Sequence, residues 1–162
     1  MYLFGVLHEM KYLENVVLCI DEYFPTPPTS LMAELPPSWD DLVHRGASRN
    51  FFSALVDLYR QKGTRIIYGN KNKYVAPESE DGMVGAIIEM MLSRHPGYVR
   101  DMSEGMRQTI DEERPELVAI GGGHADQIRD EFPNAYYVAF LKRSETTTYR
   151  PNRPNRVVLL EG

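Results

Sequence analysis

The stretch LVAIGGGHADQIRDEF, residues 117–132, changes from one kind of secondary structure to another within a few residues. Its first part is a short apolar run, which is typical of a strand buried on both faces. Three glycines follow, and the polar segment after them predicts a short helix. A buried strand that leads at once into a helix is the repeating unit of a parallel sheet, so this stretch predicts an α/β fold.

The same alternation extends in both directions along the chain. We expect strands at 2–7, 29–35, 64–69, 116–121, 134–141 and 156–161, and helices at 12–24, 48–63, 78–95, 97–113 and 124–132. This order predicts one domain over residues 1–162, a doubly wound and mostly parallel sheet of five to six strands with helices on both faces. Only a polar segment without helical periodicity separates the last two strands. We therefore expect the last strand to be antiparallel, and residues 144–155 to be a mobile, dispensable loop.

Composition narrows the class of protein. The 162 residues are 43% hydrophobic and 25% charged, which is ordinary for a globular domain, and the net charge of −5 argues against a nucleic-acid partner. A single cysteine, Cys19, lies in an apolar helical run, so we expect it to be buried and exclude a disulfide framework. The sequence shows no signal peptide and no membrane-spanning run, which predicts a cytoplasmic protein. The oligomeric state stays open, with a homodimer among the options.

Polar side chains or glycines follow the predicted strands where each strand ends. His8 follows the first strand, Glu34 lies one residue before the end of the second, Asn70 follows the third after Gly69, and His124 follows the fourth. Parallel strands end at one edge of a sheet, and ligands bind in the crevice outside that edge. The two Gly-x-x-His stretches, which end at His8 and His124, are therefore expected to meet in one site. The glycines before His124 allow close approach of a ligand to the backbone N–H groups.

Each of these side chains also has an ordinary structural explanation. His124 could cap its helix through Nδ1, and His8 could hydrogen-bond a neighbouring loop. Glu34 could form a buried ion pair with an arginine, and Asn70 is a common turn residue. Arg100 could pair with Glu104, four residues further along the same helix.

Four segments together resemble the TraB family, which includes the pheromone-shutdown proteins and the Tiki proteases, in a wider group with erythromycin esterase-like and ChaN-like proteins. They are FGVLHEMKYLENVVLCIDEYFP, LMAEL, RDMSEGM and VAIGGGHADQI, and they span nearly the whole chain in the family's order. The resemblance implies an α/β fold with His8, Glu34, Arg100 and His124 around one pocket, and metal-dependent hydrolysis as in the Tiki branch. Where many relatives have Gly-Asp, this chain has Gly69 and Asn70, and asparagine cannot act as a general base.

Three functions are open from these residues. In the first, a hydrolase of peptides, esters or amides, His8, Glu34 and His124 bind a divalent metal (Mn, Zn or Co), or His8 and Glu34 activate water without one. Arg100 or the glycine N–H groups then stabilise the oxyanion.

In the second, a binding module holds a peptide or a small anionic ligand in the same place without chemistry, and Asn70 favours this option. The binding residues in either case would be Gly5, Gly121, Gly122, Gly123 and Asn70. A nucleotide-binding regulator that uses the glycine turn is a third option, although no acidic residue ends a following strand.

Overall fold

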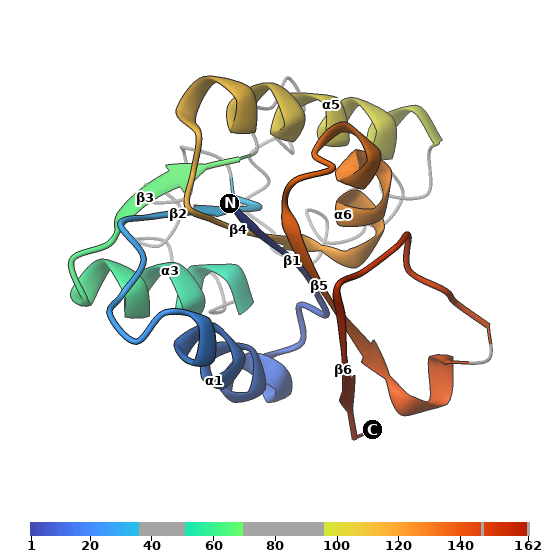
Figure 1. Ribbon diagram of the computed structural model, residues 1–162, viewed down its shortest axis with the longest axis horizontal. Helices are drawn as coiled ribbons and strands as arrows, with labels where there is room; N and C mark the ends of the chain where they lie inside the picture. The colour runs from blue at the N-terminus through green and yellow to red at the C-terminus, as the bar shows by residue number, and fades with distance from the viewer. Residues whose placement is uncertain (36–50, 70–95, 147, 162) are drawn as a thin grey trace, which may run out of the picture.

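The computed structural model describes residues 1–35, 51–69, 96–146 and 148–161 (Figure 1). It confirms the α/β fold. The strands are β1 (Tyr2–Val6), β2 (Ser30–Ala33), β3 (Arg65–Tyr68), β4 (Leu117–Gly121), β5 (Tyr136–Lys142) and β6 (Arg156–Leu160). The helices are α1 (Leu13–Tyr23), α3 (Phe51–Gln61), α5 (Pro96–Glu113) and α6 (Gly122–Ile128), with short 3₁₀ turns η1 (Met10–Tyr12), η2 (Arg129–Glu131) and η3 (Arg143–Glu145). The helix expected at 78–95 lies outside the described residues.

The strands form one parallel sheet in the order β3-β2-β4-β1-β5-β6. Helices α1 and α3 cover one face, and α5 and α6 cover the other, as Figure 1 shows. Right-handed crossovers explain this division. The connections from β1 to β2 and from β2 to β3 run toward one edge of the sheet, and those from β3 to β4 and from β4 to β5 run toward the other. Two right-handed connections that run toward opposite edges of the sheet must therefore cross it on opposite faces.

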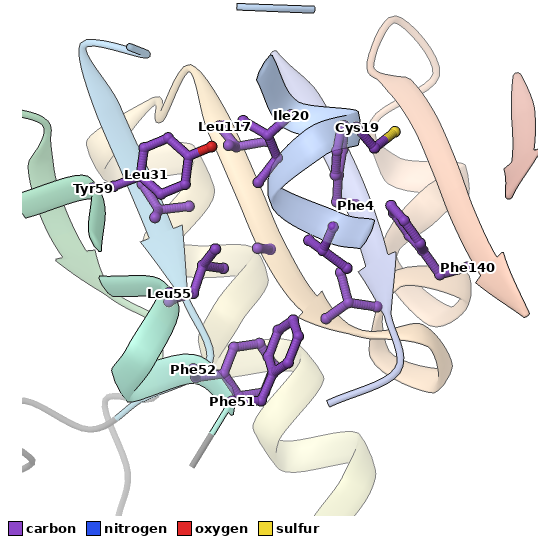
Figure 2. Close-up of a cluster of buried hydrophobic side chains, with 14 of the residues drawn as sticks. Phe4, Cys19, Ile20, Leu31, Phe51, Phe52, Leu55, Tyr59, Leu117 and Phe140 are labelled. Atoms are coloured by element: carbon purple, nitrogen blue, oxygen red, sulfur yellow. The ribbon is translucent and has the colours of Figure 1, made fainter. Parts of the chain in front are cut away.

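The core consists of two apolar layers, one on each side of the sheet. Alternate residues of each strand enter alternate layers, so that Phe4 packs on the α1 and α3 side whereas Leu3 packs under α5 and α6. Figure 2 shows the first layer, where side chains of α1 and α3 meet those of the sheet. Cys19 lies in this layer with 4% of its surface exposed, which confirms that it is a buried apolar residue. Burial of both faces in β1, β2, β4 and most of β5 explains why these strands read as unbroken apolar runs, whereas the edge strands β3 and β6 are partly exposed.

The direction of the last strand corrects our expectation. β6 is parallel to β5, with Ala139 opposite Val157 and Leu141 opposite Leu159. A parallel connection needs about a dozen residues but no helix, and residues 143–155 are long enough to cross back over the sheet. The connection passes on the face of α6, as a right-handed crossover in this direction requires.

The crossover segment forms hydrogen bonds with the rest of the domain, which argue against the mobility that we expected; that it is dispensable stays a prediction. The backbone N–H of Asn152 donates to Asp126 Oδ1 over 2.9 Å, and its side-chain amide donates to the Asp126 carbonyl over 3.2 Å. Asn155 Oδ1 accepts a hydrogen bond from the backbone N–H of Tyr137 over 2.8 Å, just before β6 begins. Polar side chains therefore fix a segment that has no apolar periodicity.

Helix ends follow the expected chemistry. Gly63 follows α3 with a φ of 85°, in the left-handed region that favours glycine after a helix. α5 begins at Pro96, because proline suits the first position of a helix, where its missing N–H is not needed. Within the described ranges, no helix combines the length and the apolar character needed to cross a membrane.

Candidate functional site

The site lies where the chain leaves neighbouring strands in opposite directions. β2 leads to β3 at one edge of the sheet and β4 leads toward β5 at the other, yet β2 and β4 are adjacent. Ligands of open α/β sheets bind outside such a switch point. Glu34 is the first residue after β2, and Gly121 ends β4 and precedes α6. His8 lies two residues beyond Val6, which is the register partner of Gly121 in β1.

Three side chains converge on Gly121, and we call them, with this glycine, the Gly121 site. A Cβ atom at Gly121 would lie 3.1 Å from Glu34 Oε2, 3.7 Å from His124 Cδ2 and 3.8 Å from His8 Cδ2. The Gly121 N–H donates to Glu34 Oε2 over 2.6 Å. Glycine at this position therefore leaves room for the carboxylate and both imidazoles. The two Gly-x-x-His stretches, far apart in sequence, place their histidines beside the same residue.

Glu34 and His124 form the inner part of the Gly121 site. Glu34 Oε1 lies 3.5 Å from His124 Nε2, and their side chains are only 15% and 13% exposed. Burial, and secondarily the charge of His8, lower the pKa of His124 to about 4. His124 is therefore neutral at pH 7, and its contact with Glu34 is not an ion pair between two full charges. A neutral imidazole is the form that binds metals and accepts protons.

The other nitrogen of His124 faces α5. Nδ1 lies 2.7 Å from Ser103 Oγ, and the same hydroxyl donates to Gln127 Oε1 over 2.5 Å. His124 therefore does not cap its helix through Nδ1, which rules out that explanation. The residue before α6 is Gly121, and α6 has no side-chain cap.

His8 lies at the outer part of the Gly121 site. Its side chain is exposed, and its ring stacks on Phe52 of α3 with 5.8 Å between ring centroids and 27° between ring planes. Phe52 is only 6% exposed, so a fixed apolar surface supports one face of the imidazole.

The other predicted residues have different positions. Gly5 is buried inside β1, where a Cβ would lie 2.8 Å from Tyr137 Oη and 3.0 Å from Ala125 Cβ, so close packing of α6 accounts for it. Gly122 and Gly123 begin α6. Arg100 belongs to α5, but its side chain and the whole of Asn70 lie outside the described residues. Within the described part of the chain, no three His, Cys, Asp or Glu side chains already form a metal-binding group.

Sequence reasoning missed Ser103 and Gln127. Each had a signal in the helical spacing: Gln127 follows His124 by three residues on α6, and residues three apart share a helix face. Ser103 lies within the segment RDMSEGM, three residues after Arg100. Phe52 was expected in a helix, but no local pattern connected it with His8.

Comparisons with family models, with curated proteins and with solved structures find no match for this chain. The fold class rests on the sheet described above. The TraB resemblance stays a prediction that rests on four short segments, and the roles of the Gly121 site rest on its geometry.

Proposed function

We propose that the chain is a metal-dependent hydrolase of the TraB-like type, with a divalent cation between Glu34 and His124. The 3.5 Å separation of Glu34 Oε1 and His124 Nε2 carries this proposal. Two ligand atoms bound to one tetrahedral zinc ion at about 2.0–2.1 Å lie about 3.4 Å apart. The two donor atoms thus fit one cation without moving.

His8 is the third ligand of the proposed site. Its ring carbon Cδ2 lies 3.8 Å from the position that a Cβ atom at Gly121 would take. The same position lies near Glu34 Oε2 and His124 Cδ2. Because no three described side chains already form a metal-binding group, the exposed ring of His8 must turn toward the cation when it binds. Two imidazoles and one carboxylate then leave open positions for water and substrate, as catalytic zinc sites do.

The remaining residues have roles around this centre. When bound, the cation would lower the pKa of a water molecule, which would then serve as the nucleophile. The Gly121 N–H holds Glu34 Oε2, so the other carboxylate oxygen stays directed at His124. Arg100 and the N–H groups of Gly122 and Gly123, which lack intrahelical partners in the first turn of α6, are our candidates for stabilising an oxyanion.

A hydrolysis assay tests this function. The protein is freed of metal with EDTA and offered fluorogenic peptides, nitrophenyl esters and anilides, with and without Mn²⁺, Zn²⁺ or Co²⁺. We expect turnover only with a cation, and at least tenfold less turnover in His124→Gln. Turnover that is unchanged without any cation would contradict the proposal.

A binding module is the second candidate, and His8 favours it. An exposed imidazole stacked on Phe52 suits contact with a planar group of a ligand as well as with a cation. In that case a peptide or a small anionic ligand binds beside Gly121 but is recovered unchanged. Ligand binding measured on the same panel, without turnover at any cation concentration, would support this second function against the first.

Gly121 provides a sharper structural prediction. Its φ of −56° and ψ of 143° suit any residue, so Gly121→Ala should fold normally. The new Cβ would lie 3.1 Å from Glu34 Oε2 and displace the carboxylate. We expect zinc affinity, measured by calorimetry, to fall about tenfold, or about 1.4 kcal/mol.

Gly123→Ala is the matched control for this substitution. A Cβ at Gly123 would meet no atom within 4 Å, and alanine is the better residue inside a helix. This variant should keep its zinc affinity. Equal zinc affinities in Gly121→Ala and Gly123→Ala would mean that the Glu34 carboxylate beside Gly121 does not bind the cation.

A further inference from the structure

Both ring nitrogens of His124 have polar neighbours, and the two sides are different. On one side, Nδ1 lies 2.7 Å from the hydroxyl of Ser103 on α5. On the other side, Nε2 lies 3.5 Å from Glu34 Oε1. A neutral imidazole has one N–H hydrogen, so the tautomer decides which ring nitrogen donates and which can only accept.

The hydrogen bond of Ser103 with Gln127 indicates the direction of the first contact. The Ser103 hydroxyl donates to Gln127 Oε1 over 2.5 Å. With this hydrogen directed at Gln127, the Ser103 oxygen accepts from His124, and Nδ1 carries the N–H hydrogen of the ring. Nε2 is left with a lone pair that points toward Glu34.

The second contact has the length that this tautomer requires. A hydrogen bond from a ring N–H to a carboxylate is normally about 2.7–2.9 Å long. The Glu34 carboxylate makes such a short bond with the Gly121 N–H, at 2.6 Å, but stays 3.5 Å from His124 Nε2. A separation of 3.5 Å is longer than such a hydrogen bond, and it fits two acceptor atoms that would share a cation.

We propose that Ser103 and Gln127 are positioning residues that hold His124 as its Nδ1–H tautomer and so direct the Nε2 lone pair into the Gly121 site. The inference rests on the proposed function only in the role that it gives to this lone pair, which is to bind the cation. Metal-binding histidines commonly donate their second N–H to a neighbouring acceptor, which fixes the ring. Ser103 is 5% exposed, so it acts through His124 and does not contact a substrate.

Nitrogen NMR on the metal-free protein tests the tautomer directly. In protein labelled with ¹⁵N histidine at pH 7, we expect His124 to show a protonated Nδ1 and an unprotonated Nε2. Ser103→Ala should lose this preference, so that both tautomers are populated, and zinc affinity should fall about ten- to a hundredfold. Thr109→Val is the control, because it removes another buried hydroxyl of α5, one that donates to the Gly105 carbonyl and does not contact His124.

Gln127→Glu distinguishes the two directions in which this chain of hydrogen bonds could run. A carboxylate can only accept, so the variant should keep the Nδ1–H tautomer if Gln127 accepts from Ser103, as the structure has it. If Gln127 instead donated through its amide, the same variant would reverse the chain and change the tautomer.

The outcomes separate this inference from the proposed function. An Nε2–H tautomer in the unaltered protein, or the same tautomer ratio in Ser103→Ala, would overturn the inference even if zinc still binds. An Nδ1–H tautomer that depends on Ser103, in a protein that binds no cation, would support the inference and overturn the proposed function.

Discussion

Glu34→Gln is expected to leave the fold intact and to weaken divalent-cation binding about a hundredfold, which corresponds to about 2.8 kcal/mol. Glutamine keeps an oxygen that can accept from the Gly121 N–H, as Glu34 Oε2 does over 2.6 Å. Its amide would face His124 Nε2 and donate to the lone pair there. The contacts with the Gly121 N–H and with His124 therefore survive, whereas the negative ligand of the cation is lost. Calorimetric titration with Zn²⁺ and Mn²⁺, with melting curves for both proteins, measures the two effects.

Glu14→Gln is the matched control, since Glu14 is exposed in the first turn of α1 and lies outside the Gly121 site. Its cation affinity should equal that of the unaltered protein. The structural alternative is that Glu34 serves a buried ion pair with Arg100. Glu34→Gln would then lower the free energy of unfolding by about 3–5 kcal/mol, because a buried guanidinium would lose its counter-charge. Such a loss, with no cation-dependent shift in the unaltered protein, would show that Glu34 is structural.

Asp126→Ala is expected to lower the free energy of unfolding by about 3 kcal/mol. Asp126 Oδ1 accepts from Tyr137 Oη over 2.6 Å and from the Asn152 N–H over 2.9 Å. Tyr137 is fully buried, and burial, together with the Asp126 carboxylate, raises its pKa, so its hydroxyl stays protonated. A hydrogen bond to a charged group contributes about 1.5–3 kcal/mol, and loss of the acceptor leaves a buried hydroxyl unsatisfied. Urea unfolding measures the loss.

Two milder substitutions should lower the free energy of unfolding by smaller amounts. Asp126→Asn keeps one oxygen as an acceptor and should lose clearly less stability than Asp126→Ala. Asn152→Ala removes only the 3.2 Å bond from the side-chain amide to the Asp126 carbonyl and keeps the backbone N–H, so its loss should be below about 1 kcal/mol. If all three variants were as stable as the unaltered protein, the crossover before β6 would not depend on Asp126.

The architecture was predictable because burial on both faces of a parallel sheet leaves unbroken apolar runs, and each run in this chain is bounded by a helix or a turn. The direction of β6 was not predictable from the same signal. Hydrogen bonds of Asn152 and Asn155 with distant parts of the chain accompany the crossover, and residues of this kind look the same in a hairpin loop and in a crossover. The apolar pattern does not record which acceptors they meet.

The Gly121 site divides in a similar way. His8, Glu34 and His124 could be predicted because parallel strands end at one edge, so the residues that follow them meet whatever their separation in sequence. The position of β4 between β2 and β1, which brings Glu34 and His124 into contact, comes from the order of the strands. Ser103 was not predictable, since its contact with His124 depends on how α5 packs against α6.

Anomalous diffraction from crystals grown with zinc tests the central claim most directly. A zinc ion should give one strong peak beside Gly121, within about 2.0–2.2 Å of both Glu34 Oε1 and His124 Nε2, with the ring of His8 turned toward it. The same peak should be missing in crystals of Glu34→Gln. A zinc-soaked crystal without a peak between these two atoms, or with the same peak in Glu34→Gln, would contradict the account.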